Sequence, residues 1–240
     1  MSTPPLQSKS QDESQIESKA ESKAESNPYL PLMIDFTDKI VVIFGGGAVG
    51  ERKVKRFAEK ALVTVVSSSL TPDLQEMEKD DSILFIEKDL SKLTDGEIFD
   101  CMSDAFLVIA ATSDSEVNRR IVSMAKTAGV LVNDTEKADE VIIPSLIERG
   151  GLQIAISSGG DSPAVTKYAR MKIVGAIDNN FEQMILLQNE MREYLKTIIS
   201  DQKKRQKILW EIMNDEEIWD LLSTDFEKAR EKAMKLSSDF

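Results

Sequence analysis

Three glycines with the spacing G-x-G-x-x-G stand directly after an apolar run. They are Gly45, Gly47 and Gly50, and the apolar run before them is Ile40–Phe44. The first glycine permits a tight turn, the second lets a phosphate approach the backbone, and the third lets a helix pack closely on the strand. Free N–H groups at the start of that helix then face the phosphates. The pattern predicts a dinucleotide site, and a glycine-rich structural turn is the alternative.

A second apolar run, Leu62–Val66, ends in three serines, Ser67, Ser68 and Ser69. In many NAD sites this position carries an acidic residue that holds the ribose. Serine hydroxyls can also hydrogen-bond a ribose, but they neither repel a 2′-phosphate nor supply an arginine to hold one. We therefore expect NAD as the cofactor and favour it over NADP.

The composition narrows the possible chemistry. The chain of 240 residues carries a net charge of −12, which argues against a nucleic-acid partner. It has one cysteine, Cys101, and no histidine, so we expect no disulfide framework and no metal site. Proton transfer then falls to carboxylates, lysine, tyrosine or water. No apolar run reaches the roughly 18 residues of a membrane span, and no signal-peptide pattern opens the chain, so we expect a cytoplasmic protein.

The apolar runs alternate with helical patterns, which indicates an α/β fold with a doubly wound, Rossmann-type parallel sheet. Ligands of such sheets bind beyond the carboxyl ends of the strands. The loops there, including Thr112–Ser115 and Asn133–Thr135, are therefore expected to share one crevice with the glycine turn. The expected strands are 40–44, 62–66, 83–86, 105–112 and 130–132. Helices are expected after the glycine turn, over 71–79 and after a cap at Ser113 or Asp114.

The pattern changes after the fifth strand. Residues 141–147 and 152–157 flank Glu148–Gly151, which predicts a β-hairpin. From Ser162 onward the sequence is helical, with one apolar face formed by Phe181, Met184, Ile185, Met191, Leu195 and Ile198. We expect four regions: a disordered low-complexity tail over 1–30, an NAD-binding domain over 31–138, a hairpin and dimerisation segment over 139–160, and a helical domain over 161–240.

Several of these motifs occur together in one known family. The stretches Val42–Lys53, Ile109–Thr112 with Val117–Arg119, Ile143–Ser145 and above all Ile156–Ala164 resemble the precorrin-2 dehydrogenases of sirohaem synthesis. The resemblance runs from about Leu32 to about Leu222. It implies oxidation of precorrin-2 to sirohydrochlorin with NAD⁺ as hydride acceptor, in a homodimer.

The resemblance also implies roles for individual residues. An aspartate just past the fifth strand is the key acid of the family, and Asp134 stands at that place, with Glu136 as the fallback. A turn-forming role is the alternative for Asp134. Cofactor contacts carry over to Ala48 and Val49, and to Ser68 and Ser69. We expect the nicotinamide near Thr112 and Asp134.

A tetrapyrrole substrate makes further demands on the chain. The small residues Ser157, Ser158, Gly159 and Gly160 either let a large planar ring approach or simply form a turn before a helix. The substrate carries many carboxylates, so its pocket must gather positive charge in an acidic protein. The candidates are Arg119, Arg120, Lys167 and Arg170.

Other functions remain open at this point. Some members of the family also insert iron into sirohydrochlorin, so a bifunctional dehydrogenase and ferrochelatase is one alternative. A non-catalytic NAD-sensing module is another, and a dehydrogenase of a different small metabolite is a third. Without histidine the chain is poorly equipped to bind a metal, so we favour the dehydrogenase alone.

Overall fold

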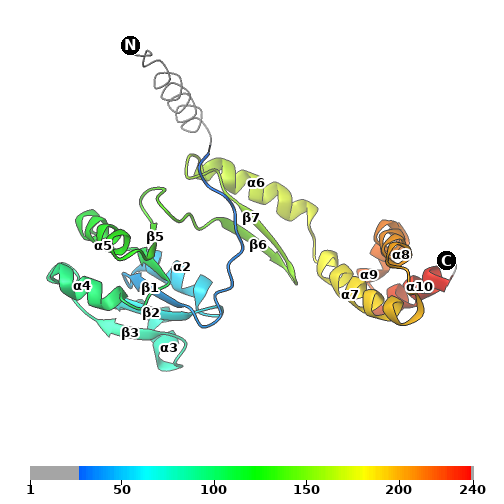
Figure 1. The fold of residues 1–240 in the computed structure, drawn as a ribbon, viewed down its shortest axis with the longest axis horizontal. Coiled ribbons are helices and arrows are strands. Elements are labelled where there is room, and N and C mark those ends of the chain that lie inside the picture. Colours follow the sequence, from blue (N-terminus) through cyan, green and yellow to red (C-terminus); the bar gives the residue numbers. More distant parts are fainter. Residues whose placement is uncertain (1–26, 239–240) are drawn as a thin grey trace, which may run out of the picture. The chain divides into compact units, whose positions relative to one another are not determined.

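The computed structural model describes residues 27–238, which form two compact units that meet between Ile143 and Pro144 (Figure 1). Residues 1–26 of the predicted tail lie outside the described residues. Residues 27–39 contain no strand, although Leu32, Ile34 and Phe36 alternate as in an edge strand.

The first unit is a five-stranded parallel sheet with the strand order β3-β2-β1-β4-β5. This confirms the predicted doubly wound fold. The structure adds one helix that the sequence did not lead us to expect, α4, and shortens β4 relative to the predicted 105–112. The elements are β1 (Ile40–Phe44), α2 (Ala48–Phe57), β2 (Leu62–Ser67), α3 (Pro72–Lys79), β3 (Leu84–Glu87), α4 (Asp95–Met102), β4 (Leu107–Ala110), α5 (Ser115–Ala128) and β5 (Leu131–Asp134).

Helix starts in this unit are fixed by side-chain caps. Thr94 and Glu97 form a reciprocal capping box at α4, and Asp114 accepts hydrogen bonds from the first turn of α5. Each such cap stabilises its helix by about 1 kcal/mol because it satisfies N–H groups that have no partner within the helix. The caps thereby fix where each loop at the carboxyl edge of the sheet gives way to its helix.

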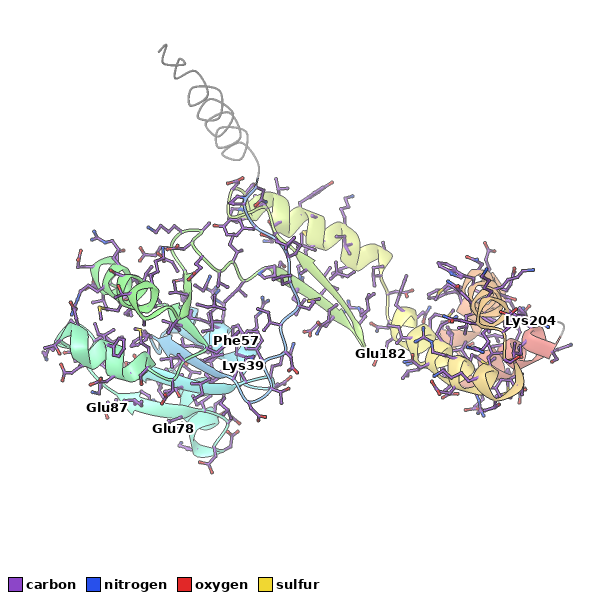
Figure 2. The ribbon with its side chains drawn as sticks, viewed as in Figure 1. Lys39, Phe57, Glu78, Glu87, Glu182 and Lys204 are labelled. Carbon is purple, nitrogen blue, oxygen red and sulfur yellow. The ribbon has the colours of Figure 1, made fainter. Side chains whose placement is uncertain are left out.

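The two faces of the sheet are covered by different helices. One core contains Val117 and Ile121 of α5 with Ile98 and Met102 of α4. The other contains Val54 and Phe57 of α2, Leu74 of α3, and Val41, Ile43, Leu107 and Ile109 of the sheet. Phe57 is marked in Figure 2 at the end of α2. The strands after β1 are added first on its β2 side and then on its β4 side, so the strand order reverses at the β1–β4 pair. A crevice forms at the carboxyl ends of the strands at such a point.

The second unit begins with the predicted hairpin, β6 (Ser145–Arg149) and β7 (Leu152–Ile156), whose strands are shorter than expected. The tip of the hairpin approaches α7, since a Cβ on Gly150 would lie 2.7 Å from Cγ of Glu182 (Figure 2). The helices are α6 (Pro163–Ala176), α7 (Asn180–Ile198), α8 (Gln202–Asn214), α9 (Glu216–Leu222) and α10 (Phe226–Ser238).

The core of the helical region follows the predicted apolar face of α7 only in part. Met184, Met191 and Leu195 are buried, as expected. Ile198 is 52% exposed, and Leu187 takes a fully buried place instead. The predicted face therefore misplaced the last turn of α7, where the helix ends at Ile198.

The glycine turn between β1 and α2 is built on very close backbone approaches. Gly45 has φ +119°, and a Cβ there would lie 2.4 Å from the carbonyl oxygen of Ala111. A Cβ on Gly50 would lie 1.9 Å from the carbonyl oxygen of Gly45. Gly47 differs, since its Cβ would meet nothing within 4 Å. Gly45 and Gly50 therefore hold the turn together, while Gly47 leaves open space above it.

We predict that alanine destabilises the protein at Gly50 but has little effect at Gly47. Gly50→Ala should lower the free energy of unfolding by about 3 kcal/mol or more, because the backbone has to move to admit the methyl group. The melting temperature should fall by roughly 6–12 °C. Gly47→Ala should change the free energy by no more than about 1 kcal/mol. Differential scanning calorimetry of the two variants tests this, and equal melting temperatures would contradict it.

Candidate active site

A cavity of about 300 Å³ lies at the carboxyl ends of β1, β2, β3 and β4. The structure brings the glycine turn, the serines and Thr112 together there, as the sequence predicts for a shared crevice. Asn133–Thr135, which we expected in the same crevice, is not part of the cavity lining. The lining consists of Gly45–Gly47, Ser67–Ser69, Asp89–Ser91, Ala111–Asp114 and Val117.

The start of α2 is open toward this cavity. Gly47 caps the helix without any side-chain hydrogen bond, so the first N–H groups of α2 keep their donors for a ligand. Val49, in the first turn, is 38% exposed although it is apolar. The missing Cβ of Gly47 and the free helix end together fit the pyrophosphate of a dinucleotide.

Two features of the cavity were missed by the sequence reasoning. Gly46 was not singled out, yet a Cβ there would lie 2.2 Å from the carbonyl oxygen of Ser69, so it lets the two loops meet. Asp89, two residues after β3, places a carboxylate in the lining. Hydrogen bonds from Lys92 and Ser91 lower the pKa of Asp89 to about 2, so it is ionised at neutral pH. Its position just past a strand was the available signal.

A buried amide joins the cavity to the loop after β5. Asn118 is 1% exposed, and its Oδ1 accepts hydrogen bonds from the backbone N–H of Thr112 at 3.0 Å and from Thr112 Oγ1 at 2.7 Å. Its Nδ2 donates to the Thr112 carbonyl at 3.1 Å and to Oε1 of Glu136 at 3.0 Å. Ser115 Oγ also donates to Glu136 at 2.8 Å. Asn118 therefore fixes a carboxylate relative to the cavity wall.

Asp134 ends β5 and is 6% exposed. Its Oδ1 accepts a hydrogen bond of 2.9 Å from the backbone N–H of Glu136. The next residue, Thr135, donates through Oγ1 to the carbonyl of Ala110 at 2.8 Å, which ties the loop to the end of β4. Asp134 thus shapes the loop that presents Glu136, while one of its carboxylate oxygens keeps the capacity to accept a proton.

The proposed substrate contacts lie in different places. Arg119 is exposed on α5 and pairs with Glu116. Ser157 and Ser158 lie in the second unit, where Ser157 Oγ accepts from Gly159 N and Ser158 Oγ accepts from Ser162 N at 3.0 Å. Gly159 and Gly160 have φ values of +70° and +97°. The Ser-Ser-Gly-Gly loop is therefore a turn stabilised by its own hydroxyls before the Ser162 cap of α6.

Residues 27–238 contain neither a membrane-spanning helix nor a cluster of metal-binding side chains. No helix in this range is long and apolar enough to cross a membrane. The same residues contain no group of three or more Cys, Asp or Glu side chains arranged to hold a metal ion.

Comparisons with known proteins agree with this geometry. A family model described as "Putative NAD(P)-binding" matches residues 32–145, and one described as "Sirohaem biosynthesis protein central" matches residues 149–175. The solved structure of SirC, a precorrin-2 dehydrogenase, aligns with a TM-score of 0.67 at 23% identity, over 88% of this chain and all of that one. This match confirms the fold.

Sequence relatives identify the family of the chain. A precorrin-2 dehydrogenase from Methanosarcina barkeri is 41% identical over 215 residues, which is 90% of this chain and 96% of that protein. A putative precorrin-2 dehydrogenase from Methanocaldococcus jannaschii is 30% identical over 83% of this chain. Siroheme synthase 1 from Klebsiella pneumoniae is 31% identical, but this chain covers only 38% of its length. The chain belongs to the precorrin-2 dehydrogenase family of oxidoreductases.

Proposed function

We propose that this chain oxidises precorrin-2 to sirohydrochlorin with NAD⁺ as the hydride acceptor. The observation that carries the proposal is the side-chain-free turn Gly45–Gly47 facing the Thr112 loop, in a chain that is 41% identical to a precorrin-2 dehydrogenase over 90% of its length. The turn supplies a nucleotide site, and the loop after β5 supplies the carboxylates for proton transfer.

The chain's own residues hold the cofactor. Backbone N–H groups at Ala48 and Val49 face the pyrophosphate, and the hydroxyls of Ser67, Ser68 and Ser69 face the adenosine ribose. NAD⁺ supplies the carbon that accepts the hydride. Thr112, fixed by Asn118, forms the wall beside the nicotinamide.

The preference for NAD over NADP follows from Asp89. Its carboxylate lies in the same cavity lining as the three serines, and it is ionised at neutral pH. A 2′-phosphate would bring like charge toward this carboxylate, which costs binding free energy in a partly enclosed site. The unphosphorylated ribose of NAD⁺ avoids that cost.

The proton acceptor is a carboxylate of the loop after β5. We propose Asp134, the residue that matches the family's acid, and Glu136 is the alternative. Asp134 is buried and has one carboxylate oxygen committed to the backbone N–H of Glu136. Glu136 is exposed and is held by Ser115 and Asn118. Either carboxylate can take a proton when the substrate loses a hydride.

We also propose a homodimer with the regions predicted from the sequence: nucleotide binding over 31–138, dimerisation over 139–160 and a helical domain over 161–240. The support is α6, in which no residue is buried in the single chain. Val165, Tyr168 and Met171 on this helix are 61–63% exposed. Apolar side chains at this spacing form one helix face, which a second copy would cover. With its single cysteine, the enzyme suits the reducing cytoplasm.

The proposed reaction can be tested with purified components. Under anaerobic conditions, the purified protein mixed with NAD⁺ and precorrin-2 should form sirohydrochlorin and NADH in equal amounts, both followed by absorbance. NAD⁺ binding without turnover would support the sensing module instead. Adding ferrous or cobaltous ion tests the ferrochelatase alternative, which requires metal insertion faster than in a blank without protein.

Substitution of each carboxylate in turn shows whether Asp134 or Glu136 is the proton acceptor. Asp134→Asn should lower kcat by roughly 10²- to 10⁴-fold, because the base is lost, while the Kd of NAD⁺ stays the same. Glu136→Gln is the matched control and should keep most of the turnover. If Asp134→Asn is fully active and Glu136→Gln is not, Glu136 is the base and the proposal for Asp134 is wrong.

The proposed homodimer can be tested through the exposed face of α6. Sedimentation analysis should show a dimer for the unchanged chain and a monomer for the double variant Tyr168→Glu with Met171→Glu, because two carboxylates would be buried in the interface. Arg170→Glu, on the opposite side of the same helix, should leave the dimer intact. A monomeric unchanged chain would exclude the homodimer.

A further inference from the structure

Helix α2 carries a group of cations that the proposed reaction has not yet used. Arg52, Lys53 and Arg56 follow the glycine turn on the sides of α2 that point away from Glu51 and Lys55. Lys55 pairs with Glu51 at 2.7 Å and also with Asp73 of α3. Lys55 on one flank of α2 is therefore paired with carboxylates, and the other flank carries the basic residues Arg52, Lys53 and Arg56.

Lys53 is the unusual member of this group. It is partly buried, and it makes no hydrogen bond or ion pair among residues 27–238. Burial, together with the charges of Arg56 and Arg52, lowers the pKa of Lys53 to about 8. Other cations of the first unit, such as Lys126 with Asp139, have carboxylate partners. An ammonium group in these surroundings is well placed to take an anion from outside the chain.

The position of the basic flank follows from the topology. Glu51 and Lys55 face α3, which lies on the β2 side of α2. Val54 and Phe57 pack down on the sheet. Since the strand order is β3-β2-β1-β4-β5, the opposite flank, with Lys53, lies on the β4 side of the helix. Side chains on a helix lean toward its N-terminus, so Lys53 leans toward the carboxyl edge of the sheet, where the proposed reaction takes place.

A second unpartnered polar group lies on the same face of the sheet. Asn133 of β5 is opposite Ile109 of β4 in the register, and Ile109 belongs to the core beneath α2. Asn133 is 5% exposed, its Nδ2 donates to the carbonyl of Val141 at 2.8 Å, and its Oδ1 has no partner among the described residues. Buried amide oxygens nearly always accept a hydrogen bond. This face therefore lacks both an anion for Lys53 and a donor for Asn133.

The anion that Lys53 would bind is not explained by the NAD⁺ cavity, and Arg119 and Arg120 are less suited than Lys53 to bind an anionic substrate. The cavity that fits NAD⁺ is lined by residues 45–47, 67–69, 89–91, 111–114 and 117, and Lys53 is not among them. Of the cations expected from the sequence to meet the substrate, Arg119 pairs with Glu116, and Arg120 pairs with Asp95 and donates to the carbonyl of Leu93. Lys53 is thus a cation beside the proposed site whose charge is not already matched by a carboxylate.

We propose that Lys53 forms a subsite for a carboxylate of the tetrapyrrole, on the face of the sheet between α2 and β5, with Asn133 Oδ1 accepting from a pyrrole N–H once the ring is bound. This inference rests on the proposed function. It gives Lys53 a role in substrate binding, separate from hydride transfer at Thr112 and proton transfer after β5. The arrangement orients a polyanionic ring in a chain whose net charge is −12.

Steady-state kinetics of Lys53→Met test the subsite. The KM for precorrin-2 should rise about 10- to 100-fold, because a charge-assisted hydrogen bond is lost, while the Kd of NAD⁺ stays the same. Lys53→Arg should restore most of the affinity. Lys79→Met, an exposed lysine of α3, is the control and should match the unchanged chain. A rise in the Kd of NAD⁺ alone would assign Lys53 to the pyrophosphate and overturn the proposal.

The pH dependence supplies an independent readout. The charges that act on Lys53 come from its own helix, from Arg56 and Arg52. The residues on the facing strands, Leu107, Ile109, Leu131 and Asn133, are uncharged. Below about pH 8 Lys53 is protonated and binds the carboxylate, so kcat/KM for precorrin-2 should fall as pH rises through 8. Lys53→Arg should remove this fall, and its persistence would contradict the proposal.

Binding of sirohydrochlorin without turnover separates this proposal from the proposed function. Fluorescence quenching should show weaker binding of sirohydrochlorin to Lys53→Met than to the unchanged chain, by the same factor as the KM. If the unchanged chain fails to oxidise precorrin-2 but shows this difference, the dehydrogenase proposal fails and the subsite stands. If it turns over precorrin-2 and Lys53→Met behaves like Lys79→Met, only the subsite is wrong.

Discussion

The approach of two backbone segments at the glycine turn is the constraint on which the remaining structure depends. The carbonyl oxygen of Gly45 lies where a Cβ on Gly50 would be, and the carbonyl of Ala111 lies where a Cβ on Gly45 would be. These contacts set α2 directly on β1 and bring the end of β4 against the turn. With any larger side chain the helix start would move away from the carboxyl edge, and the open N–H groups would no longer face the cavity.

From this turn the site extends in three directions along one edge of the sheet. The serines after β2 and Asp89 after β3 bound the side that fits the adenosine. Thr112 after β4 is tied through Asn118 to Glu136, so hydrogen bonds join the cavity wall to the loop with the acids. The basic flank of α2 lies on the remaining side. The residues of the nucleotide cavity, the acids after β5 and the cations of α2 thus lie on separate loops and helices. A single parallel sheet holds these elements in register.

Most of the first unit was predictable because its strands are continuous apolar runs bounded by turn residues. Helix α4 was missed because its apolar pattern is weak, although Thr94 and Glu97 form a capping box that marks its start. Strand β4 is shorter than its apolar run because the chain at Ala105 and Ala111 packs on the core without strand pairing. Apolar periodicity reports burial, and it does not distinguish a strand from a buried loop end.

The site was predictable where function depends on backbone geometry and less so where it depends on three-dimensional neighbours. Glycine spacing alone located the turn. The part played by Asn118 depends on contacts with Thr112 and Glu136, which lie 6 and 18 residues away in the sequence. Lys53 resembled any surface lysine of an amphipathic helix until the structure showed that it is partly buried without a partner. Such features come from packing, which residue spacing does not specify.

The central claim is that a dinucleotide lies across the glycine turn with its reactive ring beside Thr112. A crystal structure of the protein with NAD⁺ tests this most directly. We expect the pyrophosphate against the N–H groups of Ala48 and Val49, with the nicotinamide ring next to Thr112 and on the side of the loop that carries Asp134 and Glu136. A nucleotide bound elsewhere, or a nicotinamide ring directed away from that loop, would contradict it.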